Sequence, residues 1–299
     1  MTLYSQRDSN IRKTWFLLTF FFVLIIGIGF IFAQVYGNPG ILYFAIAFSV
    51  LANFFTYWYS DKIVLSMTRA EPLEKKDNPD LYNIVENLSI TAGLPMPKIY
   101  VVHEEAPNAF ATGRNAKNSV IAVTDGLLRR LDRTELEGVI SHELSHIGNH
   151  DMILGTIIVI LAGFIATASN IFLRTLSWGG GRRRDDERGV GIIFLALAII
   201  GAILAPLAAT LIRLAISRKR EFLADVSGAL LTRYPEGLAS ALEKISQDQT
   251  PMRIASNATA HLFIVNPFKG KQAISWFTKL FMTHPPIEER IKALRELQI

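Results

Sequence analysis

The sequence predicts a multi-pass α-helical membrane protein whose α+β domain is interrupted in the sequence by a transmembrane hairpin. Three observations lead to this fold class. Half of the 299 residues are hydrophobic, a high share for a soluble protein of this size. These residues gather in four uncharged runs, each close to the roughly 20 residues that a helix needs to cross the bilayer core. The rest of the chain shows the helix and strand patterns of a folded domain.

The uncharged runs form two pairs, which cover residues 15–33, 41–59, 152–173 and 190–212. The first pair is separated by a short turn that contains Gly37, and it predicts a transmembrane hairpin within residues 1–60. A signal peptide has an apolar core of only about 7–15 residues, so the first run is interpreted as a retained anchor. The second pair predicts another membrane hairpin within residues 152–212.

The segments outside the hairpins, residues 61–151 and 213–299, are interpreted as two parts of one domain. In the first part, apolar residues at helical spacing predict a helix over residues 80–92. Two short stretches rich in β-branched residues predict strands at residues 98–102 and 119–124. The order of helix, strand, strand and a further helix predicts a small α+β domain.

The further helix, for which Asp132 or Thr134 is the expected N-cap, contains the HExxH motif. Its residues are His142, Glu143 and His146. Residues i and i+4 share a helix face, so the two histidines can direct their ring nitrogens at one Zn²⁺. Glu143 then projects beside the open coordination position, where it can hydrogen-bond a zinc-bound water. The pattern is typical of zinc metalloproteases and predicts one Zn²⁺ per chain; a surface helix with coincidental histidines is the alternative.

A catalytic zinc site needs a third protein ligand. His150 is interpreted as structural, because it lies one turn further along the same predicted helix, out of reach of the ion. Glu221 is the better candidate, because it follows the second hairpin closely and its helix would return beside the motif helix. Asp225 lies one turn later on the same face, where its carboxylate can accept the proton of a ligand histidine and orient the ring.

Composition excludes several other functions. The chain has no cysteine, which excludes disulfides, cysteine-ligated zinc and thiol nucleophiles. The net charge is +5, and many basic residues flank the apolar runs, where they suit lipid headgroups. No basic stripe is interleaved with aromatic residues, so we expect the lipid bilayer as a partner and no nucleic acid. The runs contain no ionisable residue, which disfavours a transporter or channel.

The distribution of basic residues predicts the orientation in the membrane. Arg7, Arg12 and Lys13 precede the first run, and the loop at residues 35–40 is uncharged. The positive-inside rule therefore puts the N-terminus and the domain in the cytosol. The loop of the second hairpin contradicts this rule, because it would carry to the outside Arg174, Arg182, Arg183, Arg184 and Arg188. We expect the second hairpin to cross, and the alternative is that it does not cross fully.

The chain resembles the HtpX-type bacterial integral membrane zinc metalloproteases, which are related to the CAAX prenyl proteases. The resemblance covers nearly the whole chain and rests on the order of the apolar runs and on motifs at Asn108–Gly113, His142–Ile147, Glu221–Asp225, Thr283–Pro286 and Glu289–Ile291. It implies a multi-pass protein of the bacterial cytoplasmic (inner) membrane. Its domain would be a zincin-like metalloprotease domain that faces the cytosol.

The resemblance also assigns roles to residues. It implies His142, His146 and Glu221 as zinc ligands and Glu143 as the catalytic glutamate. It suggests that the Asn108–Gly113 stretch lines the cleft as an edge strand that pairs with an extended substrate. It suggests in addition that His284 stabilises the oxyanion. A strand that merely ends in a turn is the alternative for Asn108, and a rigid helix start is the alternative for His284.

The implied activity is endoproteolysis of misfolded or damaged membrane proteins, in stress response and protein quality control. The substrates would be proteins, with a water activated by Glu143 as nucleophile. The alternative is an inactive or structural-metal membrane scaffold, which the presence of Glu143 disfavours. A prenyl-protein protease is a closer rival, but it would be expected to have more membrane helices. Natural substrates, cleavage specificity and oligomeric state have no signature in the sequence.

Overall fold

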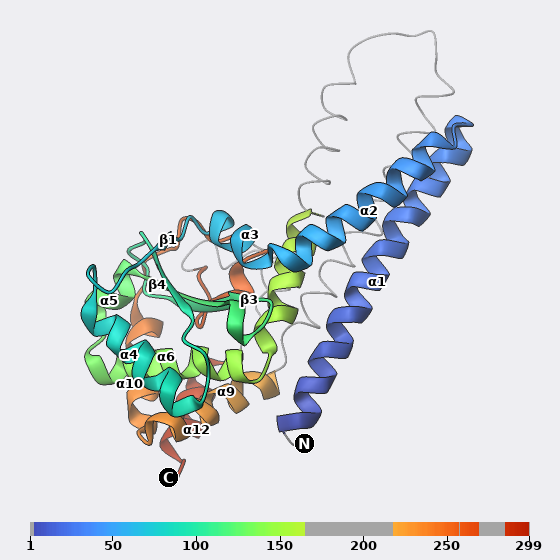
Figure 1. The fold of residues 1–299 in the computed structure, drawn as a ribbon. Helices are drawn as coiled ribbons and strands as arrows, with labels where there is room; N and C mark the ends of the chain where they lie inside the picture. The colour runs from blue at the N-terminus through green and yellow to red at the C-terminus, as the bar shows by residue number, and fades with distance from the viewer. Residues whose placement is uncertain (1–2, 165–217, 257, 269–284, 299) are drawn as a thin grey trace.

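The computed structural model describes residues 3–164, 218–256, 258–268 and 285–298 (Figure 1). The end of the third apolar run, the arginine-rich loop and the whole fourth run fall in residues 165–217, outside the described residues. His284 also lies outside them.

The N-terminal hairpin consists of α1 (Leu3–Tyr36) and α2 (Gly40–Trp58), which lie side by side in Figure 1. Each helix contains an apolar stretch long enough to cross a membrane, as predicted. Gly37 (φ 61°) in the connecting turn adopts the left-handed conformation that favours glycine. A Cβ atom on Gly29 would lie 2.2 Å from that of Ala45, so glycine at this position lets the two helices approach closely.

The domain contains a mixed four-stranded sheet with the order β1-β2-β4-β3. Its strands are β1 (Glu71–Pro72), β2 (Lys98–Val102), β3 (Ala109–Gly113) and β4 (Ser119–Thr124). β2 and β4 are parallel, and β1 and β3 pair antiparallel at the two edges. β2 and β4 cover the residues that the sequence predicts as strands. β4 lies between β2 and β3 and is buried at every residue, and β3 forms a sheet edge, as the resemblance suggests.

Helices gather below the sheet in Figure 1 and share one hydrophobic core with it. They are α4 (Pro79–Ala92), α6 (Arg133–Gly148), α9 (Arg218–Thr232), α10 (Pro235–Gln247) and α12 (Ile287–Arg295). Two shorter helices, α3 (Ser60–Met67) and α5 (Asp125–Arg130), connect elements at the sheet, as do the 3₁₀ turns η1 (Ala116–Asn118) and η2 (Ala260–Leu262). Of the two N-cap candidates for α6, Asp132 is the cap, and it forms a capping box with Glu135.

α6 contacts α9 and α10 closely, and glycines make this possible. A Cβ atom on Gly228 of α9 would lie only 3.0 Å from the backbone nitrogen of His142. A Cβ atom on Gly138 of α6 would lie 2.5 Å from the backbone nitrogen of Leu238 in α10. The missing side chains therefore allow the backbone of α9 to approach α6 at His142, and that of α10 to approach α6 one turn earlier.

The motif helix ends earlier than the sequence predicts. α6 stops at Gly148, and the chain bends by 86° into the helix Asp151–Phe164. His150 lies in the bend with φ 56°, so its expected position one turn further along the same helix is wrong. The helix after the bend, which begins the third apolar run, packs against Leu17 and Phe21 of α1.

Candidate metal centre

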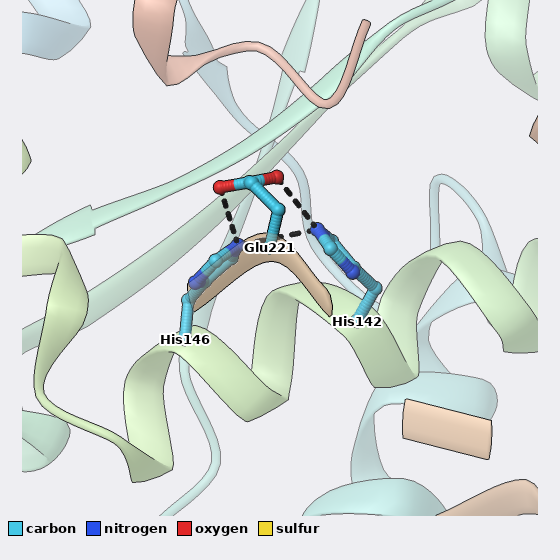
Figure 2. Close-up of side chains that lie close together, drawn as sticks. All are labelled: His142, His146 and Glu221. Atoms are coloured by element: carbon cyan, nitrogen blue, oxygen red, sulfur yellow. Dashed lines mark hydrogen bonds and ion pairs between the residues drawn. The ribbon is translucent and has the colours of Figure 1, made fainter. Parts of the chain in front are cut away.

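Three side chains from two helices converge beside β3, at one edge of the sheet. His142 and His146 extend from α6, and Glu221 extends toward them from α9 (Figure 2). The two Nε2 atoms lie 3.1 Å apart. The Glu221 carboxylate oxygens lie 3.9 Å from Nε2 of His142 and 3.8 Å from Nε2 of His146. The fold thus brings together the three residues that the sequence predicts as ligands. Glu221 and His142 lie 79 positions apart in the chain.

This donor set fits a divalent metal ion. An ion bonded to both nitrogens at about 2.0–2.1 Å would hold them about 3.3 Å apart, close to the observed 3.1 Å. The Nδ1 atom of each ring faces a carboxylate, Asp225 for His142 and Asp151 for His146. A carboxylate favours a proton on Nδ1, which leaves a lone pair on Nε2. The two Nε2 atoms therefore face each other at a distance that either one shared proton or a bound cation can span.

Asp225 lies behind His142, with Oδ1 2.9 Å from Nδ1 of the ring. A completely buried arginine, Arg290 of α12, grips this carboxylate with two hydrogen bonds, of 2.8 Å from Nε and 2.6 Å from Nη2. Its Nη1 donates to the backbone carbonyl of Ile264. Arg290 belongs to the Glu289–Ile291 motif, for which the sequence predicts no role, although a basic residue on the apolar face of an amphipathic helix indicates a buried ion pair.

Asp151 lies behind His146 in the same way, with Oδ2 3.3 Å from Nδ1 of the ring. It is the first residue of the helix after the 86° bend. The bend therefore returns the chain toward the histidine that lies five residues earlier. The sequence does not predict this contact, because the motif predicts a helix that continues straight through His150.

Burial and charge set the proton affinities of the site. For Glu143, 2% exposed, burial raises the pKa to about 7, against the opposing effects of His146 and a hydrogen bond from the backbone of Ala111. For His142, burial lowers the pKa to about 4. For His146, burial alone would lower the pKa, but its hydrogen bond with Asp151 and the surrounding carboxylates raise it to about 9. A metal ion between the rings would displace the proton that His146 holds.

A small cavity of about 60 Å³ opens beside the three residues. Glu143, Ala111 of β3 and the buried His261 of η2 contribute to its lining. His261 places Nε2 3.3 Å from the carbonyl oxygen of Gly155. No motif identified this histidine from the sequence, because its segment joins the cavity only through the tertiary fold.

Asn108, a proposed substrate contact, lies immediately before β3 and is 2% exposed. Its amide donates to the carbonyl of Val265 and accepts from the backbone of Ala109. It therefore ties the start of β3 to the segment at residues 258–268, and it is not among the residues that line the cavity. Its contact with substrate stays a prediction, as does the role of His284.

Comparison with known proteins identifies relatives across the whole chain. The profile of peptidase family M48 matches residues 75–298. The protein named protease HtpX homolog from Caldanaerobacter subterraneus subsp. tengcongensis is 48% identical, over 100% of this chain and 99% of its own. Its namesake from Thermococcus kodakarensis is also 48% identical, over 95% of each chain. The crystal structure of Ste24p from S. mikatae shares the fold, with a TM-score of 0.51 at 17% identity over 97% of this chain and 67% of that one.

Proposed function

The chain belongs to peptidase family M48, and we propose that it is a zinc-dependent endopeptidase that cleaves misfolded or damaged membrane proteins. That it is a membrane-bound metalloprotease acting on proteins follows from the family and from its relatives. The observation that supports zinc-dependent hydrolysis is the convergence of His142, His146 and Glu221 beside the buried Glu143. Two imidazoles and one carboxylate form a ligand set that catalytic zinc uses, with one position left open.

The residues of the chain divide the chemistry between them. His142, His146 and Glu221 would hold the zinc ion, which would supply the Lewis-acid chemistry that makes water a better nucleophile and the scissile carbonyl a better electrophile. Glu143 accepts the proton of the attacking water and delivers it to the amine nitrogen of the leaving group. The burial that raises the pKa of Glu143 favours the protonated carboxyl once it has accepted the proton.

The edge position of β3 supports a substrate in extended conformation. The backbone nitrogen of Thr124 donates to the carbonyl of Asn108, so in this antiparallel pair residues 109 and 111 direct their backbone groups away from β4. The backbone nitrogen of Ile264 donates to the carbonyl of Ala109, so this part of the edge is already paired within the chain. Ala111 lines the cavity beside Glu143. A peptide laid along this edge would bring its backbone to the carboxylate.

Removal of the metal tests the function. Chelation of the full-length protein in detergent is expected to lower the hydrolysis of an unfolded test protein at least about 100-fold, because zinc supplies several kcal/mol of charge stabilisation. Stoichiometric zinc should restore the rate, measured as fragment formation over time. The same test protein in its folded state is the control and should stay intact, because it offers no extended segment to an edge strand. Full activity without metal would contradict the mechanism, and bound metal without hydrolysis would indicate the structural-metal scaffold.

The basic residues before the first apolar run indicate the orientation of the protein in the membrane. We propose that the domain, assembled from residues 61–151 and 213–299, lies in the cytosol of a bacterial cell on the inner membrane, since Arg7, Arg12 and Lys13 precede the first span. The hairpin within residues 152–212 would then cross and return.

A reporter inserted within residues 179–188 tests this topology. It is expected outside the cytosol, with the same reporter after the last residue as the cytosolic control. A reporter found inside at both positions would mean that the second hairpin does not cross.

A further inference from the structure

An asparagine in α1 is buried where an exposed residue would be expected. α1 begins at Leu3, well before the uncharged run at residues 15–33. Asn10 in this extension has no exposed surface. A buried amide is unfavourable by about 1–3 kcal/mol unless it forms hydrogen bonds. The partners of Asn10 therefore explain its position.

Asn10 contacts two charged residues from the domain. Its Nδ2 donates to Oδ1 of Asp151, and its Oδ1 accepts from Nη1 of Arg220 at 3.4 Å. This orientation of the amide is chemically required, because a carboxylate only accepts and a guanidinium only donates. Arg220 also lies 4.0 Å from Asp151, so the three side chains form a closed buried triangle.

The triangle continues to the metal centre through Asp151. One oxygen of this carboxylate bonds to Asn10, and the other lies 3.3 Å from Nδ1 of His146. The arrangement parallels that of His142, whose carboxylate is held by Arg290. The difference is the origin of the support, since Asp151 is held partly by a helix of the membrane hairpin.

We propose that Asn10 makes the N-terminal membrane helix part of the metal centre, by holding Asp151 in the position that orients His146. Asn10 and Asp151 are thus positioning residues. The inference rests on the proposed metal site but does not depend on the identity of the substrate. Partners that hold a metal ligand in place typically contribute 10- to 100-fold to metal affinity. Displacement of α1 relative to the domain would accordingly weaken metal binding.

Metal affinity in the full-length protein is the direct test. Asn10→Ala is expected to weaken Zn²⁺ binding about tenfold, measured in detergent by competition with a chromogenic chelator. The visible spectrum of the Co²⁺-loaded variant should also change, because the ring of His146 is no longer held. Asn53→Ala is the matched control on α2, since the amide of Asn53 donates only to Ser49 of its own helix among the contacts described. It should bind Zn²⁺ as the wild type does.

A double-mutant cycle separates positioning from a general structural role. Asp151→Ala should weaken Zn²⁺ binding 10- to 100-fold, and adding Asn10→Ala should weaken it no further, because Asn10 acts through Asp151. Additive effects, or wild-type affinity and an unchanged Co²⁺ spectrum in Asn10→Ala, would overturn the inference. Should Asn10→Ala not fold, Asn10→Gln, which moves the amide by one methylene, replaces it with the same expected direction.

The outcomes also separate this inference from the proposed function. A wild-type protein that binds metal without hydrolysing protein would contradict the function, and the affinities would still decide the role of Asn10. A wild-type protein that binds no metal would overturn both.

Discussion

The substitution Glu143→Gln is expected to lower the hydrolysis of an unfolded protein by about 10²- to 10⁴-fold, while the chain keeps its metal. That range is the usual contribution of a positioned general acid and base, and a glutamine cannot accept the proton of water. The amide has nearly the shape of the carboxylate and can still accept the hydrogen bond from Ala111. The fold should therefore be retained. Initial rates, together with metal content per chain, provide the measurement.

Glu221→Gln is the matched control for this prediction, because it changes the other glutamate of the site by the same atoms. It removes an anionic ligand, so metal content as well as activity is expected to fall. A Glu143→Gln variant with the rate of the wild type would exclude Glu143 as the proton carrier. Wild-type metal affinity in Glu221→Gln would exclude Glu221 as a ligand.

The parts of the fold that the sequence predicts are those with a local pattern. β4 (Ser119–Thr124) and β2 (Lys98–Val102) each have a run of β-branched residues, and periodicity reports burial on such short scales. The HExxH helix is recognisable because its spacing places both histidines on one face. Glu221 is predictable as a ligand because a catalytic metal site needs a third protein ligand. Its helix follows the second hairpin, which would bring it back beside the motif helix.

The end of the motif helix does have a local signal in the sequence. Gly148 followed by Asn149 is a combination typical of a helix C-terminus. The motif nevertheless predicts a helix that continues through His150, which instead adopts φ 56° in the bend. Without this bend, Asp151 is only the last residue of the first part of the domain, at residues 61–151, and the sequence does not predict its contact with His146.

The partners of the residues that support the metal centre cannot be predicted from a local pattern. Asn10 meets Asp151 across 141 positions, and Arg290 meets Asp225 across 65. Each stands among other polar residues of its helix, and only the tertiary fold decides which partner it contacts. A charge that must be buried, as in Arg290, can be suspected from an amphipathic pattern. Its partner cannot be read from the same pattern.

Arg290→Met is expected to destabilise the domain by about 3–5 kcal/mol, the usual effect of breaking a buried ion pair from one side. The carboxylate of Asp225 would lose both hydrogen bonds from the guanidinium and remain buried. Urea unfolding in detergent provides the free energy. Arg295→Met on the same helix is the matched control, because Arg295 pairs with Glu236 and Glu243 at the exposed surface. It should leave stability nearly unchanged.

A second substitution divides the effect of Arg290 into stability and ligand orientation. Adding Asp225→Leu to Arg290→Met removes the unpaired charge, and replacing a buried pair by apolar side chains is often neutral for stability. Most of the lost free energy of unfolding should therefore return. Metal affinity should stay 10- to 100-fold weaker, because Nδ1 of His142 no longer faces a carboxylate. If affinity recovered together with stability, the pair would only hold the fold, and the orientation of His142 would depend on the ion itself.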